Sequence, residues 1–248
     1  SDEEKLRRLL EEVRRLAKRV IDELERVLRE SKRLAEENIE ELDKALEEVK
    51  RLIDDVIKKL RDGARIEEVV EEIRRVLKRV VELLRRVSDD TRRILERNVE
   101  LLERIVEKLE RVLRRVVRVL EDVTREERLK ELVRRVEELL KEVLRRVREI
   151  VKRLADLHRK VLKESEDLVR KVEEIAKDIV DKLRTTTDSE TIERLLRELL
   201  KVLKEIVDRH RRIIERLLKA SEDAVRELKK LIEETLRVLT DVVRRTET

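Results

Sequence analysis

The sequence predicts an all-α fold: a single-chain antiparallel four-helix bundle of long, nearly straight helices, each of about 60 residues. Three observations predict it. Charged residues make up 52% of the 248-residue chain and hydrophobic residues 40%, with Glu, Lys, Arg, Leu and Val dominant, which is typical of long helices. Apolar residues recur at steps of three and four, the period of a helix. The chain has one glycine and no proline, whereas ordinary domains carry several glycines.

Charge and cysteine content exclude several classes of protein. Intrinsic disorder is the other interpretation of high charge, but the net charge is only +5 and the aliphatic fraction is large. The 67 Lys and Arg residues are interleaved with 62 Asp and Glu residues, which indicates a solvated, ion-paired surface. A sequence without cysteine excludes disulfides and thiolate chemistry. Because no apolar run exceeds two residues, we expect no membrane-spanning helix.

The first helix is expected over residues 2–61. Its core-facing positions run from Leu6 to Leu60 with an average step of 3.6 residues. A strict 3.5-residue repeat would impose a left-handed supercoil, so the longer step predicts a nearly straight helix. Ser1 or Asp2 is the expected N-cap, since two glutamates follow in the first turn.

The second helix is expected over residues 65–122, after a turn at the single glycine, Gly63. A glycine just past the last apolar position is what a left-handed C-cap requires. The apolar rhythm breaks after Val123. At that break, Thr124 and Glu127 have the spacing of a capping box, which predicts the start of a third helix.

The third and fourth helices are expected over residues 125–184 and 189–246. The polar stretch 184–190 separates them and ends in Asp188 and Ser189, which are good N-cap residues. Short connections between helices of nearly equal length imply antiparallel neighbours in one bundle. We therefore expect residues 1–248 to form one helical domain.

An alternative interpretation breaks every helix near its middle and gives eight helices of ordinary length. Its break points would be the mid-helix serines Ser31, Ser88, Ser165 and Ser221. No glycine or proline accompanies these serines, and the apolar rhythm continues through them. The sequence therefore favours four long helices.

Polar residues interrupt the aliphatic stripe near the middle of each helix. When alternate helices are reversed, one histidine, Asn or Thr from each helix falls at a similar level, and the remaining residues fall about two turns above or below. We predict that they form a buried polar network: Ser31, Asn38, Thr91, Asn98, His158, Ser165, His210 and Ser221.

The physical use of such a network is to define the register of the helices. Buried polar groups are tolerated when they are hydrogen-bonded, and Asn, His, Ser and Thr together offer matching donors and acceptors. Sliding a helix by one heptad would bury these groups against Leu and Val. The competing interpretation is that individual Ser or Thr residues lie at the edge of the stripe and reach water.

The sequence offers little support for chemistry at these residues. His158 and His210 belong to no Glu-x-x-His motif and have aliphatic neighbours one turn away, so no metal, haem or other cofactor is expected. His158 and Ser165 share a face but are about 10 Å apart by helix rise, too far for a nucleophile and its base. No glycine-rich loop exists to bind phosphate. We expect no enzyme.

Macromolecular partners are also not indicated. The densest basic stretch, residues 111–118, has acidic neighbours and no aromatic residue for stacking on bases, so nucleic-acid binding is not expected. A membrane-surface role is not expected either, because the apolar stripes are needed for the core.

The whole chain resembles computationally designed helical bundles with buried hydrogen-bond networks. The resemblance rests on the Glu, Lys and Arg surface, the Leu and Val core, equal helix lengths, the cap at Asp188-Ser189-Glu190-Thr191, and the central Asn38, Asn98, His158 and His210. It implies a scaffold, an orthogonal binding pair, a switch or an assembly component. The long helices and the presence of all four in one chain depart from a designed heterodimer half.

These observations predict a structural protein with no natural activity, monomeric and without a required partner or cofactor. The alternative is an interaction or assembly module, either an oligomer building block or a switch that responds to pH through its histidines.

Overall fold

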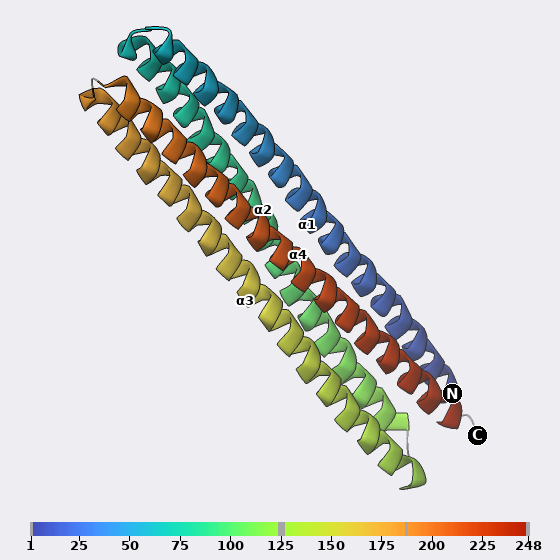
Figure 1. Cartoon of the computed structure of the whole chain (residues 1–248). Helices are drawn as coiled ribbons and strands as arrows, with labels where there is room; N and C mark the ends of the chain where they lie inside the picture. The colour runs from blue at the N-terminus through green and yellow to red at the C-terminus, as the bar shows by residue number, and fades with distance from the viewer. Residues whose placement is uncertain (1, 124–126, 187, 247–248) are drawn as a thin grey trace. The chain divides into compact units, whose positions relative to one another are not determined.

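A computed structural model describes residues 2–123, 127–186 and 188–246, and within them the chain forms four long helices (Figure 1). They are α1 (Asp2–Arg61), α2 (Ile66–Val123), α3 (Glu127–Thr185) and α4 (Ser189–Thr246). The predicted all-α fold is confirmed. The predicted bounds of α1 and α4 agree with the structure, α2 lies one residue later at both ends, and α3 extends one residue further.

The alternative of eight shorter helices is wrong. Each long helix continues without a break through its mid-helix serine: Ser31 in α1, Ser88 in α2, Ser165 in α3 and Ser221 in α4. A serine hydroxyl can compete for backbone hydrogen bonds, but a buried aliphatic stripe on both sides keeps the helical path.

Gly63 ends α1 in a Schellman motif. The Ala64 amide donates to the Lys59 carbonyl at 2.9 Å, and the Gly63 amide donates to the Leu60 carbonyl at 3.2 Å. Among the described residues, Gly63 alone has a positive φ, 92°. A Cβ at this position would meet no atom within 4 Å, so the backbone conformation, and not space, is what requires glycine.

Asp188 caps the start of α4. Its carboxylate accepts hydrogen bonds from the Glu190 amide at 3.2 Å and from the Thr191 hydroxyl at 2.9 Å. The expected caps at Ser1 and at Thr124 lie outside the described residues, as do the first two positions predicted for the third helix.

The chain divides into two compact units, each built from part of every helix. Unit 1 contains residues 1–30, 96–158 and 219–248, and unit 2 contains residues 31–95 and 159–218. The expectation that the chain is one domain stays a prediction.

Each unit buries an aliphatic core drawn from all four helices. In unit 1, Leu24, Leu102 and Ile105 are completely buried, and in unit 2 the same holds for Ile192 and Leu196. Burying a side chain of this size is favourable by about 1.5–3 kcal/mol relative to exposing it. Since these cores contain no aromatic ring, packing of Leu, Val and Ile supplies the cohesion.

Ion pairs in unit 2 show that α1 and α4 are antiparallel neighbours. Asp43 accepts from Arg211 at 2.5 Å, and Glu193 accepts from Arg61 at 2.6 Å. A step of 18 residues forward along α1 therefore matches 18 residues backward along α4. Only antiparallel helices in constant register give equal and opposite steps.

The remaining neighbours in unit 2 follow from ion pairs of the same kind. Those pairs join α1 to α2 (Lys59–Glu72, 3.0 Å), α2 to α3 (Arg85–Glu173, 2.5 Å) and α3 to α4 (Glu164–Arg216, 3.1 Å). In unit 2 the helices are thus arranged in chain order around the core, with α1 diagonal to α3 and α2 diagonal to α4. The sequence alone had left this arrangement open.

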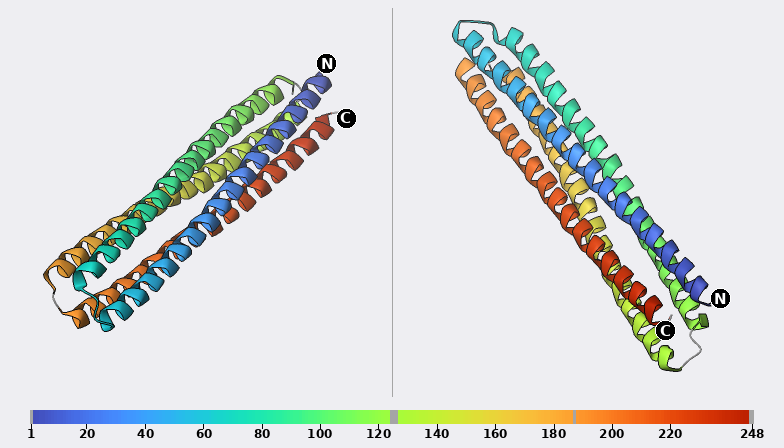
Figure 2. Two further views of the ribbon diagram at one scale, coloured as in Figure 1. Left: turned by 90° about the horizontal axis from the view of Figure 1, so that it is seen from above. Right: turned by 90° about the vertical axis from the view of Figure 1, so that its right-hand side faces the viewer.

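Unit 1 has the same set of neighbours along α1 and α2. In it, α1 contacts α4 through an Arg14–Thr240 hydrogen bond of 3.3 Å and α2 through a Glu12–Arg115 ion pair of 3.1 Å. Glu110 of α2 accepts from the Nε of Arg148 in α3 at 2.6 Å. Figure 2 shows the first and last helices side by side in this unit in both views.

Replacing Gly63 with alanine should destabilise the protein by about 1 kcal/mol, because an alanine at positive φ brings its Cβ close to the backbone. Urea unfolding followed by circular dichroism at 222 nm would measure the change. Asp62→Ala, at the neighbouring exposed position, is the matched control and should change stability by less than about 0.5 kcal/mol. An equal effect of both substitutions would contradict the C-cap assignment.

Candidate functional site

All of the polar residues predicted for the central network are buried. Their side chains are 1% to 6% exposed, although serine, asparagine and histidine are more often found at the surface. In unit 2 these residues are Ser31, Asn38, Thr91, Ser165 and His210, and in unit 1 they are Asn98, His158 and Ser221. The interpretation that single hydroxyls lie at the edge of the stripe and reach water is therefore wrong for these positions.

Two further buried polar residues were not included in the predicted network. Ser88 of α2 and Thr235 of α4 are each 8% exposed. Thr235 occupies a regular position of the apolar stripe, and this position could have predicted its burial from the sequence. Its hydroxyl donates to the Leu231 carbonyl one turn earlier at 2.7 Å, so its donor needs no other helix.

A buried hydrogen bond links α1 to α2 in unit 2. The Asn38 side-chain amide donates to the Thr91 hydroxyl oxygen at 3.1 Å, and that hydroxyl donates to the Val87 carbonyl at 2.7 Å. The Thr91 hydroxyl thus donates a hydrogen bond within its own helix and accepts one from the neighbouring helix. Of the predicted residues, Asn38 and Thr91 are the pair brought together by this bond. Ser31, Asn98 and Ser221 each have a polar interaction of their own.

His158 of α3 is held by its own helix. Its Nδ1 lies 2.7 Å from the Leu154 carbonyl oxygen, and because a carbonyl only accepts, we assign the proton to Nδ1. The Nε2 atom, which is then an acceptor, is buried without a hydrogen-bond partner among the described residues. Burial lowers the pKa of His158, and the bond to Leu154 opposes that effect.

His210 of α4 has a more strongly shifted pKa. Burial lowers it from 6.5 to about 4, because a buried imidazolium loses its hydration. The Nε2 of His210 and the hydroxyl oxygen of Ser165 have no hydrogen-bond partner in the described part of the chain. Both groups belong to unit 2, and both are at least 95% buried.

The described residues contain no set of side chains suited to metal chemistry. Within residues 2–123, 127–186 and 188–246, no group of three or more His, Cys, Asp or Glu side chains could hold a metal ion. Over the same ranges, no helix is long and apolar enough to cross a membrane.

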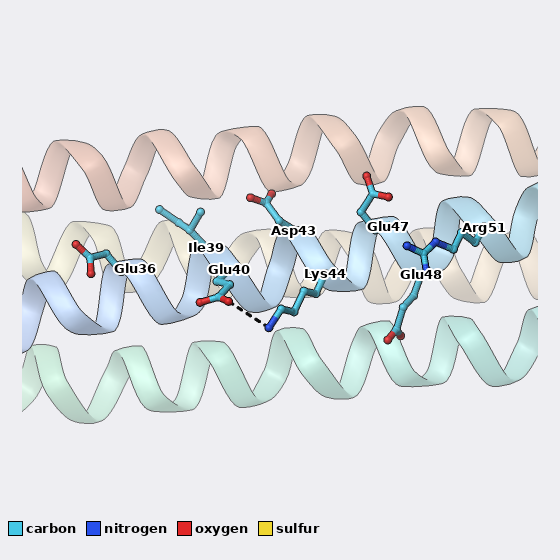
Figure 3. A pocket seen from close by; sticks show the side chains of 8 residues that line it. All are labelled: Glu36, Ile39, Glu40, Asp43, Lys44, Glu47, Glu48 and Arg51. Atoms are coloured by element: carbon cyan, nitrogen blue, oxygen red, sulfur yellow. Dashed lines mark ion pairs between the residues drawn. The ribbon is translucent and has the colours of Figure 1, made fainter.

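One surface pocket of unit 2 is a stretch of mostly charged side chains on one helix. It is lined by residues 36–51 of α1, where Lys44 Nζ pairs with Glu40 Oε1 at 3.1 Å (Figure 3). Substrate sites are usually concave, mostly apolar and formed by several elements. This pocket is a solvated helix face.

No protein-family model matches the chain, and no curated protein matches it. A solved structure described as a "Computationally designed three helix bundle" is similar to it, with 20% sequence identity and a TM-score of 0.28. That similarity covers 98% of this chain and 95% of the other. The four long helices, the aliphatic cores and the few buried hydrogen bonds fit a designed helical bundle.

Replacing Thr91 with valine should destabilise the protein by about 1–3 kcal/mol, because the buried Asn38 amide loses its acceptor. Removing both polar groups, as Asn38→Leu with Thr91→Val, should cost less than the single substitution. Denaturant midpoints of the four variants in a double-mutant cycle would measure the coupling. Additive effects of the two substitutions would contradict a hydrogen bond of this kind.

Stability should fall as the pH drops below about 6.5, the histidine pKa in the unfolded chain. Since burial lowers the pKa of His210 to about 4, the unfolded state binds a proton that the folded state does not. Between about pH 7.5 and pH 5 this should cost about 2 kcal/mol from His210 alone. Stability should be constant at higher pH.

Urea unfolding at several pH values would measure this dependence. A chain carrying His158→Leu and His210→Leu is the control, and its stability should be nearly constant between about pH 7.5 and pH 5. An equal loss in the control would show that carboxylates, and not the histidines, cause the dependence.

Proposed function

We propose that this chain is a designed structural scaffold with no natural biochemical activity, in which the central buried polar residues set the register and pairing of the helices. It requires no cofactor and no partner, and it is a monomer. The observation that carries the proposal is the buried Asn38–Thr91 hydrogen bond between two helices, in a protein whose interior is mostly aliphatic.

Aliphatic stripes alone would leave the register weakly defined. A stripe of Leu and Val looks similar after a shift of one heptad, so many alignments would bury comparable apolar area. A shift of α2 along α1 would separate Asn38 from Thr91, and a shift that faces Asn38 with an aliphatic residue would leave a buried amide unpaired, at a cost of about 1–3 kcal/mol. The polar pair therefore penalises the shifted alignments more than it stabilises the native one.

Surface ion pairs support the same alignment but discriminate less strongly. Arg85–Glu173 and Arg92–Glu166 join α2 to α3 one heptad apart. Exposed pairs of this kind contribute little individually and weaken in salt. A one-heptad shift would also place some charged residues opposite new partners of the right sign. The buried polar residues are the stronger determinant.

A test of the proposal is to measure the register directly. Because the sequence has no cysteine, spin labels can be placed at Lys50→Cys in α1 and Lys204→Cys in α4, both exposed positions of unit 2. The distance between them is then measured by double electron–electron resonance. A one-heptad shift of α4 changes the relative height by about 10 Å.

The parent chain should give one narrow distance. A chain in which the eight network residues are replaced by Ala, Val or Leu should stay helical and give several distances. Labels at Lys32→Cys and Lys50→Cys, both on α1, are the control and should give the same narrow distance in both chains. One narrow α1–α4 distance in the apolar chain would contradict the register function.

A second candidate function is an assembly module or switch that responds to pH. The buried His210, with its pKa lowered to about 4 and its Nε2 unpaired among the described residues, favours it. Burial is the cause of that shift, and the adjacent Arg211 is paired with Asp43 of α1. Light scattering at about pH 7.5 and pH 5 distinguishes the candidates: a change in mass between them supports the switch, and a constant monomer mass supports the scaffold.

A further inference from the structure

Between the helices of unit 1 lies an apolar cavity of about 40 Å³ that is partly open to solvent. Each of the four helices contributes three residues to its lining. Val13 and Ala17 of α1, Val147 of α3 and Ile232 of α4 are buried lining residues. The cavity belongs entirely to unit 1 and is separate from the central polar residues.

The lining offers almost nothing to a polar molecule. Its single polar side chain is Thr235, whose hydroxyl already donates to the Leu231 carbonyl at 2.7 Å. A buried water needs about two to four hydrogen-bond partners, and this cavity leaves at most the acceptor lone pair of one hydroxyl. A volume of about 40 Å³ would hold a water by size, but the water would lose most of its hydrogen bonds.

The size of the cavity limits its apolar occupants. A dry protein cavity of about 150 Å³, lined by Leu, Ile and Phe, binds benzene or xenon. The cavity in unit 1 is several times smaller, so an aromatic ring does not fit without movement of the lining. A single large, polarisable atom is small enough to enter this space and gains dispersion contacts with the aliphatic lining.

Alanine among leucine and valine positions is the sequence feature associated with the cavity. Ala17 lines it, and in unit 2 Ala45 lines a second apolar cavity of about 20 Å³. A side chain with one carbon beyond Cα fills less of the space between helices than its Leu and Val neighbours. The smaller cavity allows the same substitution, alanine to valine, to be made at a control position in the same chain.

We propose that the unit 1 cavity is a binding site for a single small apolar ligand of the size of xenon, which contacts Val13, Ala17, Val147 and Ile232. The binding is driven by dispersion contacts with the aliphatic lining and needs no polar group. It is independent of the register function proposed above, since none of the central polar residues lines the cavity.

Methyl NMR spectra of the full chain under increasing xenon pressure test the proposal. The Ala17 methyl and the valine and isoleucine methyls of the lining should shift and reach saturation. In Ala17→Val the added methyl groups occupy the cavity, and the apparent affinity should fall by about tenfold or more. The matched control, Ala45→Val in unit 2, should keep the affinity within about twofold of the parent chain.

Three outcomes would overturn the proposal. They are shifts that rise linearly with pressure without saturation, shifts at Ala17 that persist unchanged in Ala17→Val, and cross-peaks between water and the Ala17 methyl that show a hydrated cavity. If Ala17→Val fails to fold, the variant Val147→Ala, in which the cavity is larger, tests the proposal instead. It should bind xenon at least as tightly as the parent chain, and failure to bind xenon would reject the site.

Discussion

Each helix of this protein buries one face of Leu, Val and Ile, and helices so rich in charge would not associate without that burial. Lys, Arg, Asp and Glu make up 52% of the chain, and their exposed ion pairs contribute little individually. Residues such as Leu24 in unit 1 and Leu196 in unit 2 are completely removed from water. The direction in which each helix turns its apolar face follows from this one requirement.

Because the interior is mostly aliphatic, the hydrogen bonds of its polar groups have a large effect on stability. At the surface, an asparagine or histidine could replace a hydrogen bond to protein with one to water at little cost. In the aliphatic interior, Asn38 needs Thr91, and the two histidines stay neutral because a charge would lose its hydration. The buried polar residues thus specify the alignment of the helices, because the aliphatic side chains around them do not. A leucine side chain packs against almost any apolar neighbour, whereas a buried amide group needs a hydrogen-bond partner at a suitable distance.

The sequence predicted the helices well because local chemistry determines them. A 3.6-residue period marks the buried face, and Gly63 and Asp188 mark two helix ends. Burial of the polar residues could also be predicted, since they occupy the stripe. Their partners could not, because Asn38 has several candidates of suitable chemistry at similar heights. The order of the helices around each core was also beyond prediction, since the stripes are alike and only contacts such as Asp43–Arg211 distinguish neighbours from diagonal helices.

The adjacency of α1 and α4 has a consequence for how the chain folds. Lys59 and Glu72, across the first turn, are separated by 13 residues, whereas Asp43 and Arg211 are separated by 168 and Arg14 and Thr240 by 226. Closing a longer loop costs more entropy, although the cost grows only by about 0.6 kcal/mol for each doubling of length. Contacts between consecutive helices therefore close at a lower entropic cost than the contacts between α1 and α4. Force applied to the termini would act first on the contacts between α1 and α4.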